Sequence, residues 1–339
     1  MKRTLSITLV VLAAACLFYA STFINTARAQ SEQGEANGRG HVHQINHDND
    51  GDVEDKNSKD PTAAPELNPY GLPANGRALT TGGTGTVTPK ITNHGGPVIG
   101  TPTIYIIFYG NWNQANGSDT PAGQQIIRDW GHNIGGTPHY LLNTSYPGVS
   151  GNTVWGGETS DTGSQGTNLT DTKVFNVVKS AINTGRLPYD SNGVYFVVTS
   201  SNVGETSGFC SRYCGWHTAG NNTNGARIRF SFVGNANRCL SSCAAQTNSP
   251  NGNAGVDGAI SVLTHELEEA NTDPDLNAWY DSQGAENADK CAWTFGHFQY
   301  QTASGAWANM HIGTRDYLIQ RNLQQISSGD LCKVDSTHN

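Results

Sequence analysis

Charged side chains are scarce in this sequence and make up only 14% of its 339 residues, whereas glycine occurs 40 times. This composition is typical of a loop-rich extracellular protein and argues against a helical cytosolic one. Basic residues are in deficit, because the formal net charge is −8. A chain without a basic excess lacks the electrostatic footprint of nucleic-acid or anionic-membrane binding, so we expect neither kind of partner.

Several sequence motifs are also missing. The chain contains no G-x-S-x-G nucleophile elbow, no P-loop, no dinucleotide-binding fingerprint and no internal repeat. Each motif carries a defined chemistry: a serine nucleophile, a phosphate cradle or a pyrophosphate site. Their absence leaves no motif support for those three kinds of site.

The apolar run at residues 5–20 is shorter than the roughly 20 residues that a membrane-spanning helix needs. It follows Lys2 and Arg3 and precedes Ala27-Arg28-Ala29, which is the pattern of a secretory signal peptide with its cleavage site. We therefore predict a signal peptide at residues 1–29. The mature chain is expected in an extracellular space such as an apoplast, cell wall or periplasm, without membrane attachment.

Residues 30–87 show almost no apolar periodicity. They begin with an acidic, histidine-containing stretch and continue with sequence rich in Pro, Gly, Asn and Thr. Such a segment cannot bury enough apolar surface to offset the entropy of ordering it. We predict a disordered tail here, followed by a folded domain at residues 88–339.

Six of the seven cysteines follow the predicted signal peptide: Cys210, Cys214, Cys239, Cys243, Cys291 and Cys332. An even number in an exported chain predicts three disulfides. The preferred pairing joins the cysteines within each CxxxC pair and joins Cys291 to Cys332. A four-cysteine metal site formed by the two CxxxC pairs is the alternative, and the export signal argues against it.

The predicted domain alternates strands and helices. Strands are expected at residues 103–109 (TIYIIFY), 194–199 and 228–233, from dense β-branched and aromatic runs. Helices are expected to open at Thr120-Pro121 and at Thr170 or Asp171. Residues 140–157 are expected to form short strands and turns. The predicted fold class is α/β (α+β), with a mixed central sheet packed with helices and stabilised by disulfides.

A further helix is predicted between Asp257, taken as its N-cap, and Pro274, which ends it. His265 and Glu269 stand on one face of this helix because they are four residues apart. The sequence His265-Glu266-Leu267-Glu268-Glu269 reads HExxE, a variant of the zinc-hydrolase pattern HExxH. The order of elements before this helix resembles that of a zincin catalytic domain.

We interpret this motif as a metal site. His265 and Glu269 are predicted zinc ligands, since zinc accepts carboxylate oxygen in place of a second imidazole. Glu266 is the predicted general base, which would deprotonate the metal-bound water. Asp289 and Glu286 are the nearest candidates for a third ligand.

Three histidines lie further from the motif in sequence. His217 is a candidate for the second shell of the metal or a substitute ligand, while His297 and His311 are more distant candidates. Two other interpretations stay open. The helix could carry a solvated acidic face without metal, or the carboxylates could hold structural calcium.

These motifs resemble those of the EXORDIUM / phosphate-induced protein 1 family of secreted proteins, over about residues 88–335. The segments that carry the resemblance are GPVIGTPTIYIIFYGNW (96–112), VYFVVTSSNV (194–203), GFCSRYCGWHT (208–218), FVGNANRC (232–239), NGNAGVDGAISVLTHELEEANTDPDLNAWYD (251–281), ENADKC (286–291) and RDYLIQRNL (315–323). The resemblance implies secretion to a wall or apoplast-like space and a link to plant growth control. It implies no established reaction.

Two functions are therefore expected from the sequence. The first is a secreted zinc-dependent hydrolase, peptidase-like, acting on an extracellular peptide or cell-wall polymer. The second is a non-catalytic extracellular protein that binds cell-wall material or takes part in growth signalling, with the acidic cluster holding calcium or no metal.

Overall fold

The computed structural model describes residues 67–69 and 80–339. The predicted signal peptide and most of the predicted tail lie outside the described residues. The last residues of that tail are described. Backbone N–H groups of Phe295 and Gly296 donate to the carbonyls of Thr80 and Thr81, and Val87 bridges to Asp330.

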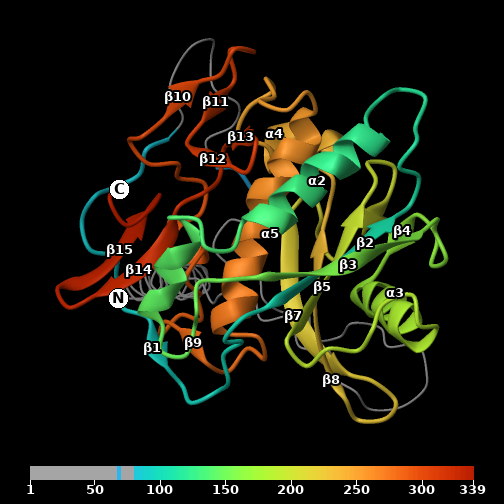
Figure 1. Cartoon of the computed structure of the whole chain (residues 1–339), viewed down its shortest axis with the longest axis horizontal. Helices are drawn as coiled ribbons and strands as arrows, with labels where there is room; N and C mark the ends of the chain where they lie inside the picture. The colour runs from blue at the N-terminus through green and yellow to red at the C-terminus, as the bar shows by residue number, and fades with distance from the viewer. Residues whose placement is uncertain (1–66, 70–79) are drawn as a thin grey trace, which may run out of the picture. The chain divides into compact units, whose positions relative to one another are not determined.

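A five-stranded mixed sheet forms the centre of the domain, in the order β3-β2-β5-β8-β7 (Figure 1). Its strands are β2 Thr103–Tyr109, β3 Val154–Asp161, β5 Gly193–Thr199, β7 Gly215–Asn221 and β8 Arg227–Val233. The first four strands in this order pair in parallel, and β7 pairs with β8 antiparallel at the edge. The continuous apolar runs of β2 and β5 suit parallel strands that are covered on both faces.

Helices cover both faces of this sheet. The chain moves from β2 to β3 in one direction and from β3 back past β2 to β5 in the other. Because such crossovers are right-handed, α2 Pro121–Asn133 and α3 Asp171–Asn183 must lie on opposite faces. Figure 1 shows α3 on one side and α2 with α5 on the other. Thr120 and Thr170 cap α2 and α3, so both predicted helix starts are confirmed.

The helix α5, Ala254–Thr272, is the longest described element and packs against β7, β8 and α2. It begins at Ala254 because Asn253 accepts a hydrogen bond from the Val256 N–H, so the predicted N-cap at Asp257 is wrong. It ends before Pro274, as predicted. From Ala259 to Thr272 every residue is buried, including its acidic ones. The alternative of a solvated acidic face is therefore wrong.

The structure contains three disulfides: Cys210–Cys239, Cys214–Cys243 and Cys291–Cys332. The third bridge confirms the prediction, but pairing within each CxxxC segment is wrong. Both segments space their cysteines by four residues, so two bridges of equal sequence separation, 29 residues, run side by side between them. They join the segment just before β7 to α4 and the residue that precedes it, and α4 packs against α5.

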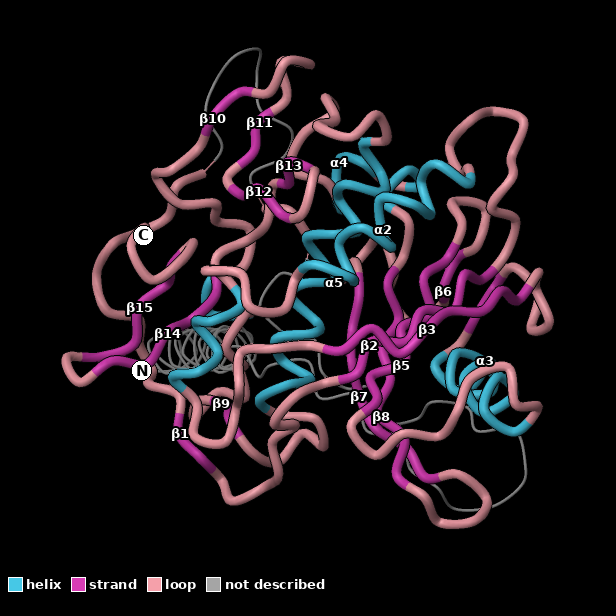
Figure 2. Tube along the Cα trace, in the orientation of Figure 1, coloured by secondary structure: helices cyan, strands magenta, loops and turns pink. Residues whose placement is uncertain are grey.

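The C-terminal part consists of short two-stranded sheets joined by loops, which Figure 2 shows as brief magenta segments. Among the described residues no helix is both long and apolar enough to cross a membrane. The remaining elements are β1 Thr92–Asn93, η1 Tyr140–Ser145, β4 Asn168–Leu169, β6 Gly204–Glu205, η2 Ala236–Arg238, α4 Leu240–Cys243, β9 Trp279–Tyr280, η3 Asp289–Cys291, β10 Tyr300–Gln301, β11 Trp307–Ala308, β12 Met310–Ile312, β13 Arg315–Tyr317, β14 Asn322–Ile326 and β15 Gly329–Lys333.

The prediction of a mixed central sheet packed with helices and stabilised by disulfides is confirmed. Two local predictions differ from the structure. Residues 140–157 contain a 3₁₀ helix, Tyr140–Ser145, and the start of a long strand rather than several short strands. The edge strand β7 was not predicted, because its sequence GWHTAGN is poor in β-branched residues.

Candidate metal centre

Three of the predicted ligands converge in the structure. The Nε2 atom of His265 lies 3.0 Å from Glu269 Oε1 and 3.5 Å from Asp289 Oδ1, and all three residues are buried. His265 and Glu269 meet because they are one turn apart on α5, whereas Asp289 comes from η3. We call His265, Glu269 and Asp289 the first triad.

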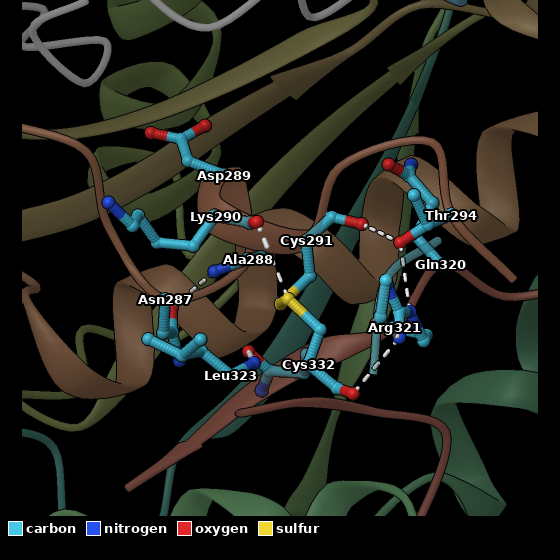
Figure 3. Close-up of a disulfide and its surroundings, with 12 residues drawn as sticks. Asn287, Ala288, Asp289, Lys290, Cys291, Thr294, Gln320, Arg321, Leu323 and Cys332 are labelled. Carbon is cyan, nitrogen blue, oxygen red and sulfur yellow. Dashed lines mark hydrogen bonds between the residues drawn. A yellow bond between two sulfur atoms is a disulfide. The ribbon is translucent and has the colours of Figure 1, made fainter. Parts of the chain in front are cut away.

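The η3 segment is held in place from two sides. Its Asp289 N–H donates to Glu269 Oε1 at 3.0 Å, which ties the loop to α5. On the other side, Cys291 is bonded to Cys332, and Arg321 donates to the Cys332 carbonyl at 3.1 Å. Figure 3 shows the Asp289 carboxylate pointing away from this disulfide. The disulfide therefore anchors the backbone that presents Asp289.

A second group lies beside the first and shares one member with it. His217 Nδ1 is 3.5 Å from Glu266 Oε2 and 3.5 Å from Glu269 Oε2. We call His217, Glu266 and Glu269 the second triad. His217 is brought here by β7, which approaches α5 closely at Gly215. A Cβ atom at Gly215 would lie 2.6 Å from Val262 and 3.2 Å from Glu266 Oε1, so only glycine fits this contact.

Glu286 belongs to neither triad but adjoins the second. Its Oε1 atom is 3.7 Å from His217 Nε2, which is beyond hydrogen-bond distance. This oxygen is fully buried and has no hydrogen-bond partner among the described residues. A buried carboxylate oxygen without a hydrogen bond is costly, so the ionised form of Glu286 is disfavoured at this position.

The ionisation of the cluster follows from its excess of carboxylates. Burial alone would lower the pKa of each histidine, but Glu286, Glu266 and Glu269 raise the pKa of His217 well above its ordinary value. The pKa of His265 rises in the same way beside Glu269 and Asp289.

The pKa values of the carboxylates shift in different directions. Burial raises the pKa of Glu269, but the two histidines outweigh it and hold that pKa well below its usual range. Burial and neighbouring carboxylates raise the pKa of Glu286 well above its usual value. Burial also raises the pKa of Glu266 and of Asp289. The cluster therefore contains one carboxylate that is strongly held in its ionised form, Glu269, and three carboxyl groups whose protonated form is favoured by burial.

The donor atoms of each triad suit a small tetrahedral cation. Ligands at about 2.0–2.1 Å from a tetrahedral zinc are about 3.3 Å from one another. The observed separations from the histidine nitrogens are 3.0 and 3.5 Å in the first triad and 3.5 Å in the second. In each triad the ligand atoms all lie within 4.8 Å of one another.

The other histidines considered from the sequence lie elsewhere. His311 is on the exposed hairpin β12–β13, where its Nδ1 is 2.8 Å from Asp316, and His297 is exposed. Sequence reasoning missed a different buried pair on α5. Nε2 of His139 lies 2.9 Å from Glu268 Oε1, and the Nδ1 atom of the same ring is 2.6 Å from the Val334 carbonyl.

A small cavity of about 20 Å³ lies near preceding turns of α5 and not over the triads. Its walls include Asp257, Gly258 and Ser261 of α5 and the side chain of Trp293. It has room for about one water molecule.

The fold and the site together define a disulfide-bridged α+β domain with a buried histidine–carboxylate cluster on its central helix. The family described as "Phosphate-induced protein 1 conserved region" matches residues 91–317, which include both triads. The chain belongs to this family, and the resemblance seen in the sequence is confirmed.

Two relatives from Arabidopsis thaliana are similar to this chain. It is 30% identical to Protein EXORDIUM-like 3 over 275 residues, which cover 68% of this chain and 79% of that protein. It is 30% identical to Protein EXORDIUM-like 5 over 217 residues, which cover 55% of this chain and 58% of that protein. No solved structure matches the chain.

Proposed function

We propose that this protein is an exported zinc-dependent hydrolase of the peptidase type. The observation that carries the proposal is the convergence of His265, Glu269 and Asp289 at separations that suit one cation. Among the described residues, the ion pairs made by these two carboxylates and by Glu266 and Glu286 are with histidines and not with Lys or Arg. The positive charge expected beside four buried carboxylates would come from a metal ion.

The donor chemistry supports zinc over calcium. Calcium takes six to eight oxygen ligands, whereas each triad here contains an imidazole nitrogen. Imidazole together with carboxylate oxygen suits zinc and similar transition metals. Three protein ligands leave the fourth position for water, as catalytic zinc sites do.

In this proposal the residues of the cluster have separate roles. His265, Glu269 and Asp289 would hold the zinc, which would lower the pKa of a bound water and polarise a substrate carbonyl. Glu266 follows His265 directly and would accept the proton of that water. His217, 3.5 Å from Glu266 Oε2, would orient this carboxylate. We propose a zincin-like arrangement, because one helix beside a mixed sheet carries the motif.

The setting supports export. The chain begins with a sequence of signal-peptide type, three disulfides stabilise the domain, and its relatives are EXORDIUM-like proteins. We propose an extracellular location and an extracellular peptide or cell-wall polymer as the substrate.

The test compares Glu266→Gln with Glu268→Gln, a matched change of a buried glutamate on the same helix. The zinc-loaded chain is incubated with a peptide mixture, and new N-termini are counted by mass spectrometry. We expect Glu266→Gln to lose cleavage at least 100-fold while it keeps zinc, because a general base contributes about 10²–10⁴-fold. We expect Glu268→Gln to keep both. A zinc-free wild-type chain, or a Glu266→Gln variant that cleaves normally, would refute the proposal.

One observation favours a second candidate, a non-catalytic extracellular binding protein with a structural cation. His265, the most exposed member of either triad, is only 7% accessible, and the described cavity does not open over it. Zinc binding without any cleavage, but with binding to cell-wall material that survives Glu266→Gln, would support this candidate over the hydrolase.

A further inference from the structure

We propose that the second triad is a second cation site, which shares Glu269 with the first. When this site is filled, Glu266 cannot act as a general base. The inference rests on the proposed function for the role of Glu266, but the site itself stands on its own geometry. Its ligand class is a divalent transition metal such as Zn²⁺, bound through Nδ1 of His217 and carboxylate oxygens of Glu266 and Glu269.

Glu269 has the geometry of a bridging ligand. Its Oε1 atom faces His265 at 3.0 Å, and its Oε2 atom faces His217 at 3.5 Å. One carboxylate therefore offers a separate oxygen to each imidazole. A carboxylate that presents one oxygen to each of two cation positions can hold them close together, as in two-metal sites with a separation of about 3.5–4 Å.

His217 is oriented as metal-bound histidines usually are. Its Nδ1 faces Glu266 and Glu269, while its Nε2 faces Glu286 and lies 3.4 Å from the Asp273 carbonyl. A ligating imidazole commonly directs its other nitrogen to a carboxylate or backbone carbonyl, which fixes the tautomer and the ring. The His217 ring has such partners on the side away from the second triad.

Glu286 adjoins the second triad from the other side of the His217 ring. Its Oε1 atom is buried and lies 3.7 Å from His217 Nε2. A cation on Nδ1 would leave Nε2 as an N–H donor that faces this carboxylate, so Glu286 would keep a suitable neighbour when the second triad is filled.

The charge balance points the same way. Glu266, Glu269, Glu286 and Asp289 carry four negative charges when ionised, and all four are buried. Two protonated histidines cancel two of these charges, whereas two divalent cations beside neutral histidines cancel all four. Two cations would therefore match the charge of all four carboxylates when these are ionised.

The consequence concerns Glu266. With one cation on the first triad, Glu266 is free to accept a proton. With a second cation on the second triad, Glu266 Oε2 is a ligand and cannot act as the base. The second cation therefore inhibits the proposed reaction, and activity rises with the first equivalent of metal and falls with the next.

The experiment is a calorimetric titration of the metal-free full mature chain with Zn²⁺, with Co²⁺ spectra as a second readout. We expect two equivalents for the wild type, the second bound at least 10-fold more weakly. His217→Asn should bind one equivalent, and so should His265→Asn. The number of equivalents bound by the wild type tests the second site even if a variant fails to fold. Circular dichroism checks that each variant is folded. His311→Asn, an exposed histidine outside the cluster, is the control and should bind two.

The outcomes separate this inference from the proposed function. A single wild-type equivalent that persists in His217→Asn and disappears in His265→Asn overturns the second site and leaves the hydrolase proposal standing. A single equivalent lost in His217→Asn and kept in His265→Asn overturns the two-cation site and also the first-triad assignment. No binding by the wild type overturns both.

Discussion

The helix α5 carries two buried histidine–carboxylate arrangements that differ in their balance of charge. In the pair of His139 and Glu268, one carboxylate meets one imidazole, and the second ring nitrogen contacts the Val334 carbonyl. In the two triads with Glu286, two imidazoles meet four carboxylates. We call the first arrangement, with one carboxylate for one imidazole, the complete pair, whereas the second has two more carboxylates than imidazoles. In our proposal, this surplus distinguishes a cation site from a structural ion pair.

The largest expected effect is at the complete pair. Glu268→Ala leaves His139 buried without its carboxylate, and breaking a buried ion pair by removing one partner costs about 3–5 kcal/mol. We expect that loss in the free energy of unfolding, measured by urea denaturation. The loss should be the same with chelator and with excess zinc. If excess zinc restored the lost stability, this pair would also contribute to a cation site.

Removing the disulfide that anchors Asp289 should affect both stability and the first triad. In the chain-entropy account a bridge across 41 residues contributes about 4 kcal/mol. We expect the double change Cys291→Ser with Cys332→Ser to lower stability by about this amount in urea denaturation.

The same double variant should bind zinc at least 10-fold more weakly, because groups that position ligands typically alter affinity 10–100-fold. The control is Cys210→Ser with Cys239→Ser, which removes a bridge that does not adjoin η3. Equal zinc affinities in both double variants would contradict a positioning role for Cys291–Cys332.

Removing the cation should lower the stability of the protein through the histidine–carboxylate cluster and not through the pair of His139 and Glu268. At a zinc concentration 100 times the dissociation constant, binding adds about 2.7 kcal/mol to stability. For a domain of this size that corresponds to about 5–10 °C in Tm. We expect chelator to lower the Tm of the wild type by this amount and to lower that of His265→Asn by less, because the variant lacks the first cation site. An equal shift in both chains would place the cation elsewhere.

The smallest expected effect is the pH dependence of the complete pair. Burial lowers the pKa of His139, but Glu268 outweighs it and the folded pKa lies above the unfolded value. The stabilisation is therefore full below an unfolded pKa of about 6.5 and is lost as pH rises through the folded pKa. We expect the difference in Tm between wild type and His139→Gln, both in chelator, to shrink above neutral pH. A difference in Tm that grows as pH rises would contradict a raised folded pKa of His139.

Local patterns predicted the parts of this molecule that depend on short stretches of chain. The Thr120 and Thr170 caps, the strand at Thr103–Tyr109 and the one-turn spacing of His265 and Glu269 all follow from neighbouring residues. Asp289 was named as a ligand candidate because it lies close to the motif in sequence.

The remaining features depend on contacts between distant segments. The cross-pairing of the CxxxC segments requires that α4 lies beside β7, which no spacing within either segment encodes. The position of His217 in the cluster depends on the close approach of β7 to α5 at Gly215. The partner of Glu268 is a histidine 129 positions earlier in the sequence. Helical periodicity also left open a solvated acidic face at Glu266 and Glu269, because it contains no information on the segments β7 and η3 that cover that face.

The most direct test of the cation site is the zinc content of three purified chains: wild type, His265→Asn and His139→Asn. Both variants remove a buried histidine that pairs with a carboxylate of α5, but only His265 belongs to the cluster with surplus carboxylates. We predict that His139→Asn keeps all of the wild-type zinc and that His265→Asn loses an equivalent. A zinc-free wild type, or equal zinc in the two variants, would contradict the account.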